Sequence, residues 1–264
     1  MKELLNAAIR ASLLAGKAIL EVYETEFGVE FKDDNSPLTI ADQRSHQIIS
    51  EILKETGLPL LSEEGVNIEY AVRKNWNLFW LIDPLDGTKE FVKRNGDFTV
   101  NIALIDNNLP ELGVIYVPVT DELFYGDKQN GAFKVGNASE YSRIEELKQA
   151  AIQLPLKNSL PVVVASRSHL NEDTANFINE MKIAEPDLKI LSRGSSLKIC
   201  MVAENKKAVY PRFAPTMEWD TAAGHAILRA AGGKIILAKN NDEELIYNKE
   251  NLLNPWFIAL FNSK

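Results

Sequence analysis

The first half of the chain combines helical and strand-like hydrophobic patterns. Residues 2–23 carry apolar side chains at the spacing of one helix face, which predicts an amphipathic helix. A second helix is predicted over residues 40–56, where Gly57 ends it. Short apolar runs predict strands at 58–62 and 78–82. Residues 98–133 contain several more such runs, and these predict a series of hairpins with turn signals at Asn108, Pro110 and Asn130-Gly131.

The second half alternates helix and strand more regularly. A polar helix is predicted over residues 143–151, and the segments after it predict strands at 161–166, 188–191, 207–211, 234–238 and 256–261. The helices predicted between them span 171–182, 195–205 and 219–233. Together the two halves predict an α/β fold (α+β, with mixed sheets). We expect an N-terminal α/β part at 1–155 and a C-terminal α/β part at 156–264.

The composition is that of an ordinary globular protein, with 45% hydrophobic and 25% charged residues. No run approaches the roughly 18 consecutive apolar residues of a membrane span. The N-terminal segment has no clean apolar stretch, so we expect no secretory signal peptide. Cys200 is the single cysteine, which excludes an internal disulfide and a thiolate metal cluster. We therefore expect a cytoplasmic protein, and peripheral association with the inner membrane face stays open.

The net charge of the chain limits the classes of molecule that we expect it to bind. The formal net charge of −8 argues against broad nucleic-acid binding, which depends on Lys and Arg that neutralise phosphates. A small phosphate ester remains compatible with this charge, provided that clustered cations or a bound metal hold it locally. The expected partner is therefore a small-molecule substrate, and the working expectation for the oligomeric state is a monomer.

Two carboxylates stand three residues apart at the end of the predicted strand 78–82. Asp83 and Asp86 are separated by Pro84, which stiffens the chain, and Gly87 and Thr88 follow. Buried acids repel one another and are costly to desolvate, and a hard divalent cation resolves both problems. Mg²⁺ favours a few carboxylates together with water and phosphate oxygens. The alternative is a surface turn, because Asp-Pro and Asp-Gly are common turn dipeptides.

Three further acidic positions lie far apart in the sequence. Glu63 follows a predicted strand, where acids are usually solvated. Asp220 lies at the start of a predicted helix, where an acidic cap is common. Asp42 completes a capping box that Thr39 begins. Taken singly, each of these acids has an ordinary structural explanation.

Taken together, the acidic segments resemble the motifs of one enzyme family. SEEG (62–65), DPLDGTKEF (83–91) and MEWDTAAGHAIL (217–228) are similar to the signature set of the inositol monophosphatase superfamily, which comprises Mg²⁺-dependent, lithium-sensitive phosphatases. The stretch at 83–105, with SRSH (166–169), GSSLK (194–198) and the YPRF arginine, is especially similar to the 3′(2′),5′-bisphosphate nucleotidases of the CysQ type. The resemblance covers residues from about 39 to 230. It implies a layered α-β-α-β-α sandwich.

The resemblance also implies roles for individual residues. Glu63 and Asp83, with the Leu85 carbonyl, are similar to ligands of a first Mg²⁺, and Asp83, Asp86 and Asp220 to ligands of a second; two or three ions are expected. Two such ions can stabilise both the attacking and the leaving oxygen. Asp42 would orient the Thr88 hydroxyl, which helps to deprotonate a metal-activated water, and Glu63 would also orient that water. The catalytic residues implied are Asp42, Glu63 and Thr88.

The second half supplies the positive charge that a phosphate ester needs. The positions that match His169, Ser195, Lys198 and Arg212 contact the uncleaved phosphate in the resembling family. The chemistry of these residues agrees with phosphate binding. Backbone N–H groups at the start of a helix bind phosphate, and an arginine guanidinium can donate two hydrogen bonds to it. The alternatives are helix caps for His169 and Ser195 and a solvated charge for Lys198. The substrate set is completed by Glu63, Leu85, Asp86, Gly87, Thr88 and Asp220.

The leading hypothesis is a Mg²⁺-dependent hydrolase that converts adenosine 3′,5′-bisphosphate to AMP and phosphate. The resemblance implies a role in sulfur metabolism and names 3′-phosphoadenylyl sulfate as a further candidate substrate. An inositol or sugar monophosphatase of the same superfamily is the first alternative. A non-catalytic nucleotide-binding sensor is the alternative from another class, and the intact acids and Thr88 argue against it.

Overall fold

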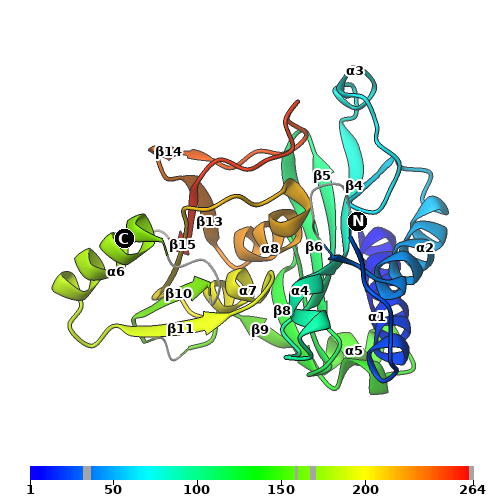
Figure 1. The fold of residues 1–264 in the computed structure, drawn as a ribbon, viewed down its shortest axis with the longest axis horizontal. Coiled ribbons are helices and arrows are strands. Elements are labelled where there is room, and N and C mark those ends of the chain that lie inside the picture. Colours follow the sequence, from blue (N-terminus) through cyan, green and yellow to red (C-terminus); the bar gives the residue numbers. More distant parts are fainter. Residues whose placement is uncertain (32–36, 158–159, 167–170, 262–264) are drawn as a thin grey trace.

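A seven-stranded sheet forms the centre of the first half of the computed structural model, which describes residues 1–31, 37–157, 160–166 and 171–261 (Figure 1). Its strands follow one another in chain order. The first two are parallel and every later pair is antiparallel, so the predicted hairpins are confirmed. The strands are β3 (Leu60–Ser62), β4 (Leu78–Asp86), β5 (Thr99–Asp106), β6 (Leu109–Val117), β7 (Glu122–Asp127), β8 (Gly131–Gly136) and β9 (Ile152–Leu154).

Two amphipathic helices cover one face of this sheet. The helices α1 (Lys2–Tyr23) and α2 (Ile40–Lys54) bury their apolar stripes against β4, β5 and β6. Thr39 caps α2, because its hydroxyl accepts from the Ala41 amide at 3.2 Å while the Asp42 carboxylate accepts from the Thr39 amide at 2.7 Å. The predicted capping box is thus confirmed. The strands β1 (Glu30–Phe31) and β2 (Pro37–Leu38) form a small separate pair.

A six-stranded sheet organises the second half. Its order is β11-β10-β12-β15-β13-β14, with β10 parallel to β11 and β12 and the remaining pairs antiparallel. The parallel strands are joined by helices, as the alternation in the sequence predicts. The strands are β10 (Val162–Ser166), β11 (Lys189–Arg193), β12 (Ala208–Arg212), β13 (Gly233–Leu237), β14 (Asn240–Glu244) and β15 (Phe257–Phe261).

The helices α7 (Leu197–Glu204) and α8 (Glu218–Ala230) lie between the two sheets, and α6 (Glu172–Ala184) covers the far face of the second one (Figure 1). One apolar core therefore joins both sheets through α7 and α8, and a second core lies under α1 and α2. This order of layers confirms the predicted α-β-α-β-α sandwich. The remaining helices are short: α3 (Tyr70–Arg73), α4 (Thr88–Val92), α5 (Ile144–Gln149) and a 3₁₀ turn at Ala138–Glu140.

The strand predictions need correction at several places. β4 continues through Asp86 instead of ending at Ile82, because Pro84 sits in an irregular part of the ladder that tolerates a missing donor. The strands β1, β2, β9 and β14 were not predicted, since the first three have only two or three residues and β14 is polar throughout. The change of sheet falls between Leu154 and Val162. The division into parts 1–155 and 156–264 stays a prediction.

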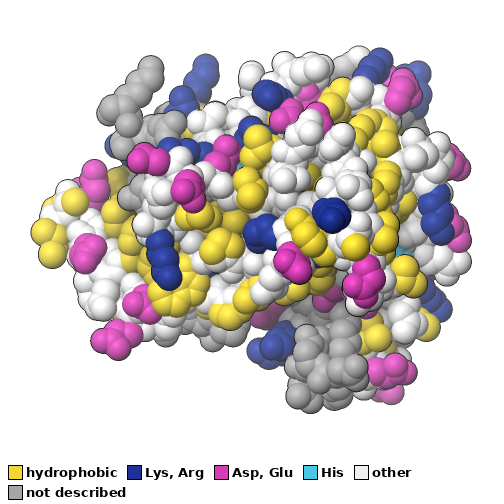
Figure 2. Space-filling model, turned by 90° about the horizontal axis from the view of Figure 1, so that it is seen from above, with side chains coloured by type: hydrophobic (Ala, Val, Ile, Leu, Met, Phe, Trp, Pro, Cys, Tyr) yellow, Lys and Arg dark blue, Asp and Glu magenta, His cyan; other side chains and the backbone are white. Residues whose placement is uncertain are grey.

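In the described part of the chain, no helix has both the length and the apolar character to cross a membrane. Figure 2 shows one face of the molecule, on which Lys and Arg side chains lie among Asp and Glu side chains.

Candidate active site

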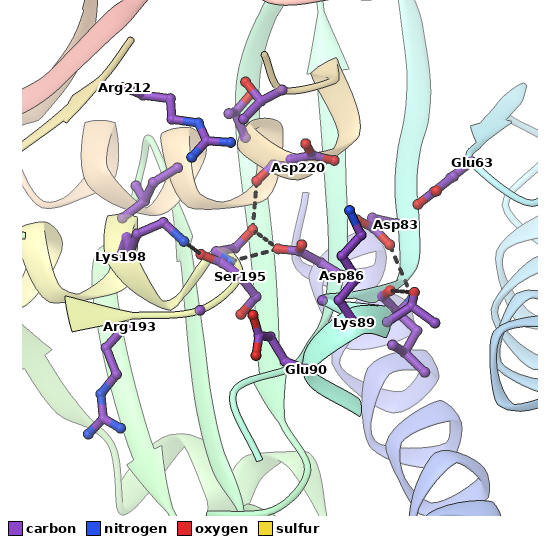
Figure 3. Close-up of a pocket in the computed structure, with 18 of the residues that line it drawn as sticks. Glu63, Asp83, Asp86, Lys89, Glu90, Arg193, Ser195, Lys198, Arg212 and Asp220 are labelled. Carbon is purple, nitrogen blue, oxygen red and sulfur yellow. Dashed lines mark hydrogen bonds between the residues drawn. The ribbon is translucent and has the colours of Figure 1, made fainter. Parts of the chain in front are cut away.

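A cavity of about 390 Å³ opens where β4, α4, α7, β12 and α8 meet. It contains the five residues predicted to hold metal, which are Glu63, Asp83, Leu85, Asp86 and Asp220. Gly87, Thr88, Ser195, Lys198 and Arg212 from the predicted substrate set also line it. Asp42 lies behind Thr88, and His169 falls outside the described residues. Figure 3 shows the acidic side chains and Arg212 directed into the same space.

A bulge in β4 brings Asp83 and Asp86 to the same side of the sheet. Asp83 pairs with Asn101 and Asp86 pairs with Thr99, so β4 advances three residues while β5 advances two. In a regular strand, residues three apart point to opposite faces. The extra residue reverses this relation, as bulges near functional sites often do. The bulge therefore explains how two acids that are three residues apart in the sequence lie on the same side of the sheet.

Asp83 is buried among other acids. The Leu85 amide donates to its Oδ1 at 3.1 Å. Burial raises the pKa of Asp83 well above its usual value, and the neighbouring carboxylates of Glu63, Asp86 and Asp220 raise it further. Glu63 reaches this site because β3 runs parallel to β4, and its own amide bonds to the Ile82 carbonyl at 3.1 Å.

Asp220 brings the second half of the chain to the same site. It lies in the first turn of α8, where its Oδ2 accepts from the Met217 amide at 2.9 Å. Asp220 thus caps the helix from its third position, whereas Met217 is the N-cap residue. Burial raises the pKa of Asp220 well above its usual value, and the Asp86 and Glu63 charges add to the rise. Asp220 is half-buried, and its cap bond and the nearby Arg212 charge oppose this rise only in part.

The chemistry of these donors fits a hard divalent cation. The acids contribute only oxygen atoms, and their repulsion would be relieved by positive charge between them. No three His, Cys, Asp or Glu side chains within the described ranges are arranged as a ready-made metal site. The fit of these residues to a divalent cation therefore rests on their oxygen donors, on the burial of the site and on the repulsion between the carboxylates.

Thr88 and Asp42 form a hydrogen-bonded pair at the edge of the acidic group. The Thr88 hydroxyl lies 3.0 Å from Asp42 Oδ1 and 3.2 Å from the Leu85 carbonyl. Asp42 is 1% exposed and its Oδ2 also accepts from the Thr39 hydroxyl at 2.7 Å. Gly87 makes the approach possible, because its φ of +91° suits glycine and a Cβ there would lie 3.0 Å from the Asp97 carbonyl.

Cationic side chains line the opposite side of the cavity. Lys198 is 7% exposed, and its ammonium donates to the Ser195 carbonyl at 2.6 Å and faces the Tyr210 ring. Burial lowers the pKa of Lys198 to about 8. Within the described structure, the buried Ser195 hydroxyl and the Arg212 Nε have no hydrogen-bond partner. Unpartnered polar atoms that line a cavity are suited to a polar ligand.

Sequence reasoning missed several residues of the cavity and its support. Ser196 and Asn101 bond to Asp86, at 2.6 Å from the Ser196 amide and 3.3 Å from the Asn101 side chain. Only the adjacency of Ser196 to the recognised Ser195 could have drawn attention to it. Asn101 is hidden inside a strand pattern. Further cavity residues that were not predicted are Lys89, Glu90, Lys93, Arg193, Tyr210 and Thr221.

The other two histidines and the cysteine lie away from this site. His225 is fully buried and hydrogen-bonds to Tyr247 and Glu244. His46 lies 2.9 Å from the Ser62 hydroxyl. Cys200 is buried in the core between the sheets. None of the three lines the cavity.

Comparisons with known proteins agree on one family. The inositol monophosphatase family model matches residues 1–260. The chain is 41% identical to the 3′(2′),5′-bisphosphate nucleotidase CysQ of Escherichia coli (strain K12), over 92% of this chain and 94% of that protein. A crystal structure of CysQ from Bacteroides thetaiotaomicron has 51% identity and a TM-score of 0.89, covering 98% of this chain and 97% of that one. A structure of an IMPase/NADP phosphatase complexed with Mg²⁺ and phosphate has 19% identity and a TM-score of 0.68, covering 93% and 85%, and shows the shared fold alone.

Proposed function

The chain belongs to the inositol monophosphatase family, and we propose that it is a Mg²⁺-dependent 3′(2′),5′-bisphosphate nucleotidase. Its curated relatives carry that activity in their names. The proposed reaction is hydrolysis of adenosine 3′,5′-bisphosphate. A water oxygen bonds to the 3′ phosphorus, the bond from phosphorus to the 3′ oxygen breaks, and AMP and phosphate are the products.

The observation that carries the proposal is the division of one cavity into an acidic side and a cationic side. Glu63, Asp83, Asp86 and Asp220 gather at one side, where Figure 3 also draws Lys89, and Lys198 and Arg212 line the other. A substrate with two phosphates suits such a cavity, because the reacting phosphate needs cations among the acids while the second phosphate can contact protein cations directly. An inositol monophosphate has no second phosphate for Lys198 and Arg212.

Glu63, Asp83, Asp86 and Asp220, with the Leu85 carbonyl, would hold Mg²⁺. When bound, Mg²⁺ would neutralise the developing charge on the transferring phosphoryl group. The residues of the chain would supply position and orientation. Such catalysis depends chiefly on placing charges and reactants, so precise support of the acids matters.

Thr88 and Asp42 would orient the attacking water. When the Thr88 hydroxyl donates to Asp42, at 3.0 Å, its lone pairs are left to accept a hydrogen bond from water in the cavity. The Asp42 carboxylate is fixed by Thr39 through two bonds of 2.7 Å, so the acceptor for Thr88 stays in place. Thr88 is thus a candidate catalytic residue, and Asp42 acts through it.

Ser195, Lys198 and Arg212 would bind the phosphate that is not cleaved. The buried Ser195 hydroxyl and Arg212 Nε lack partners within the described structure, and a phosphate oxygen would supply an acceptor for both. Lys198 would contribute its charge from the adjacent helix turn. His169 keeps its place in this set on the resemblance of SRSH alone.

The test compares phosphate release from adenosine 3′,5′-bisphosphate and from inositol 1-phosphate in the presence of Mg²⁺. We expect the nucleotide to be hydrolysed with the higher kcat/KM, and no release after Mg²⁺ is removed with a chelator. Faster turnover of inositol 1-phosphate would contradict the proposed substrate. A nucleotide that binds tightly and stays intact during prolonged incubation with Mg²⁺ would indicate a binding protein instead.

A further inference from the structure

The carboxylate of Asp86 is held on one oxygen by donors from two other elements. Asp86 Oδ2 accepts from the Ser196 amide at 2.6 Å, and the Ser196 hydroxyl lies 2.7 Å from the same oxygen. The Asn101 side-chain amide adds a longer contact of 3.3 Å. Hydrogen bonds to a carboxylate are charge-assisted and therefore strong. Asp83 and Asp220 instead accept from backbone amides close to them in sequence, and Asp83 also bonds to the Glu63 side chain.

Asn101 is fixed so that its two N–H groups face this network. The Thr99 hydroxyl donates to Asn101 Oδ1 at 2.9 Å, which orients the amide with its nitrogen toward Ser196 and Asp86. Its Nδ2 reaches the Ser196 hydroxyl at 2.9 Å. Thr99 and Asn101 are 0% and 1% exposed, so water does not compete for these bonds. Both amide hydrogens therefore have acceptors.

The Ser196 hydroxyl joins the network to α8. Its oxygen lies 2.6 Å from the Asp220 backbone carbonyl as well as 2.7 Å from Asp86 Oδ2, and it accepts from Asn101. A hydroxyl has one hydrogen, so it serves one of these two acceptors at a time. The Ser196 amide remains on Asp86 in either case. Ser196 thereby connects the ends of β4, α7 and α8 at one buried point.

We propose that Ser196 and Asn101 are positioning residues that orient Asp86 for cation binding. Because Oδ2 is engaged by these donors, Oδ1 is the oxygen left for a cation. Among the described residues, none donates a hydrogen bond to Oδ1. Partners that fix a ligand in this way typically change metal affinity or activity by about 10–100-fold when removed. The inference rests on the proposed function, since it assumes that Asp86 binds Mg²⁺.

The experiment measures Mg²⁺ binding by isothermal titration calorimetry, without substrate, in wild type, Asn101→Ala and Ser196→Ala. We expect Ser196→Ala to weaken Mg²⁺ binding about 10-fold, because it removes the hydroxyl 2.7 Å from Asp86 Oδ2 together with the acceptor of Asn101. Asn101→Ala should have a smaller effect, because its own contact to Asp86 is 3.3 Å long. Ser12→Ala is the matched control, since Ser12 is equally buried but bonds only within α1, to the Ile9 carbonyl. It should bind Mg²⁺ like wild type.

Thermal unfolding of each metal-free variant separates orientation from a merely structural role. Unchanged Mg²⁺ affinity in both variants, within twofold, would overturn the inference even if their Tm fell. If Asn101→Ala does not fold, the Mg²⁺ affinity of Ser196→Ala alone tests the inference, and a value within twofold of wild type would overturn it. A wild-type chain that binds no Mg²⁺ would instead remove the metal site on which the proposed function depends.

Discussion

Two acids at the start of α8, Glu218 fully buried and Asp220 half-buried, have different environments. Glu218 is 0% exposed, and it accepts from the Asn248 amide at 2.6 Å and from the Lys249 ammonium at 2.6 Å. Asp220, two residues further on, accepts one cap bond from the Met217 amide and faces Asp86 and Glu63, with Arg212 as a nearby cation. The protein compensates the first charge internally and leaves the second among like charges. Glu218 therefore supports the fold, whereas Asp220 is suited to a bound cation.

Burial raises the pKa of both carboxyls, and the contrast lies in the charges that surround them. Burial raises the pKa of Glu218, but Lys249 and the backbone donors oppose the rise. For Asp220, burial and the Asp86 charge both raise the pKa, and the Met217 amide opposes them. A carboxyl whose pKa is raised in the folded state makes that state less stable as pH rises through the interval between the unfolded and folded values. Asp220 therefore destabilises the folded, metal-free protein once the pH exceeds the pKa of this carboxyl in the unfolded chain.

The largest effect is expected for Asp220→Asn. Asparagine keeps an oxygen for the Met217 amide but removes a charge from the acidic group, so phosphate release should fall by roughly 1000-fold. Without metal, the variant should unfold at a higher temperature than wild type at pH 7, by roughly 2–4 °C for each kcal/mol of repulsion removed. Calorimetric unfolding with and without Mg²⁺ checks this. A metal-free variant less stable than wild type would contradict the assigned environment.

Asp42 is a third acid for this comparison, because it is buried and its carboxylate accepts from the hydroxyls of Thr88 and Thr39 and from the Thr39 amide. Thr88→Ala tests the catalytic role proposed for the Thr88 hydroxyl. The loss of the hydroxyl removes the group that would orient water, so kcat should fall about 100-fold with KM little changed. Thr88→Ser, which keeps the hydroxyl, is the matched control and should retain most activity. Equal activity of the alanine and serine variants would remove Thr88 from the catalytic residues.

Glu218→Gln should affect stability and not chemistry. The amide of glutamine cannot accept from all of the donors that Glu218 now satisfies, so the free energy of unfolding should fall by about 1–3 kcal/mol. Initial rates at a temperature well below the Tm should match those of wild type. A large loss of turnover in folded Glu218→Gln would show that the two acids do not have separate roles.

The smallest effect is expected for Lys198, on the cationic side of the cavity. The charged form of Lys198 exists below its pKa of about 8, so the binding of an anionic phosphate should weaken as pH rises through that value. Above it, KM for adenosine 3′,5′-bisphosphate should rise several-fold. Lys198→Arg should move this rise to higher pH. Lys206→Arg, at an exposed position, serves as control, and a pH profile unchanged by Lys198→Arg would contradict the assignment.

The sequence allowed much of the fold to be predicted, because long amphipathic helices such as α1 and apolar runs such as β5, which is buried on both faces, carry strong hydrophobic signals. The bulge between Asp83 and Asp86 was not predictable from period alone, since it depends on the register with β5. The strands β9 and β14 form because neighbouring strands offer an edge, which a local pattern does not reveal.

The residues of the candidate site were predicted from spacing and family resemblance, and not from the periodic patterns that predicted the fold. The spacing of Asp83 and Asp86 suggested a cation site by itself, whereas Glu63 and Asp220 joined it only through the resemblance to a family. Ser196 and Asn101 were not predicted, because their role depends on contacts across β4, β5 and α7. Serine and asparagine at such places have no distinctive local signature. Contacts between distant segments are what the structure adds.

The most direct test of the account is anomalous diffraction from crystals grown with Mn²⁺, which takes oxygen ligands as Mg²⁺ does. The account predicts anomalous density between the carboxylates of Asp83, Asp86 and Asp220, with Glu63 beside it. Well-ordered carboxylates at this site with no density between them, at a Mn²⁺ concentration that supports phosphate release, would contradict it.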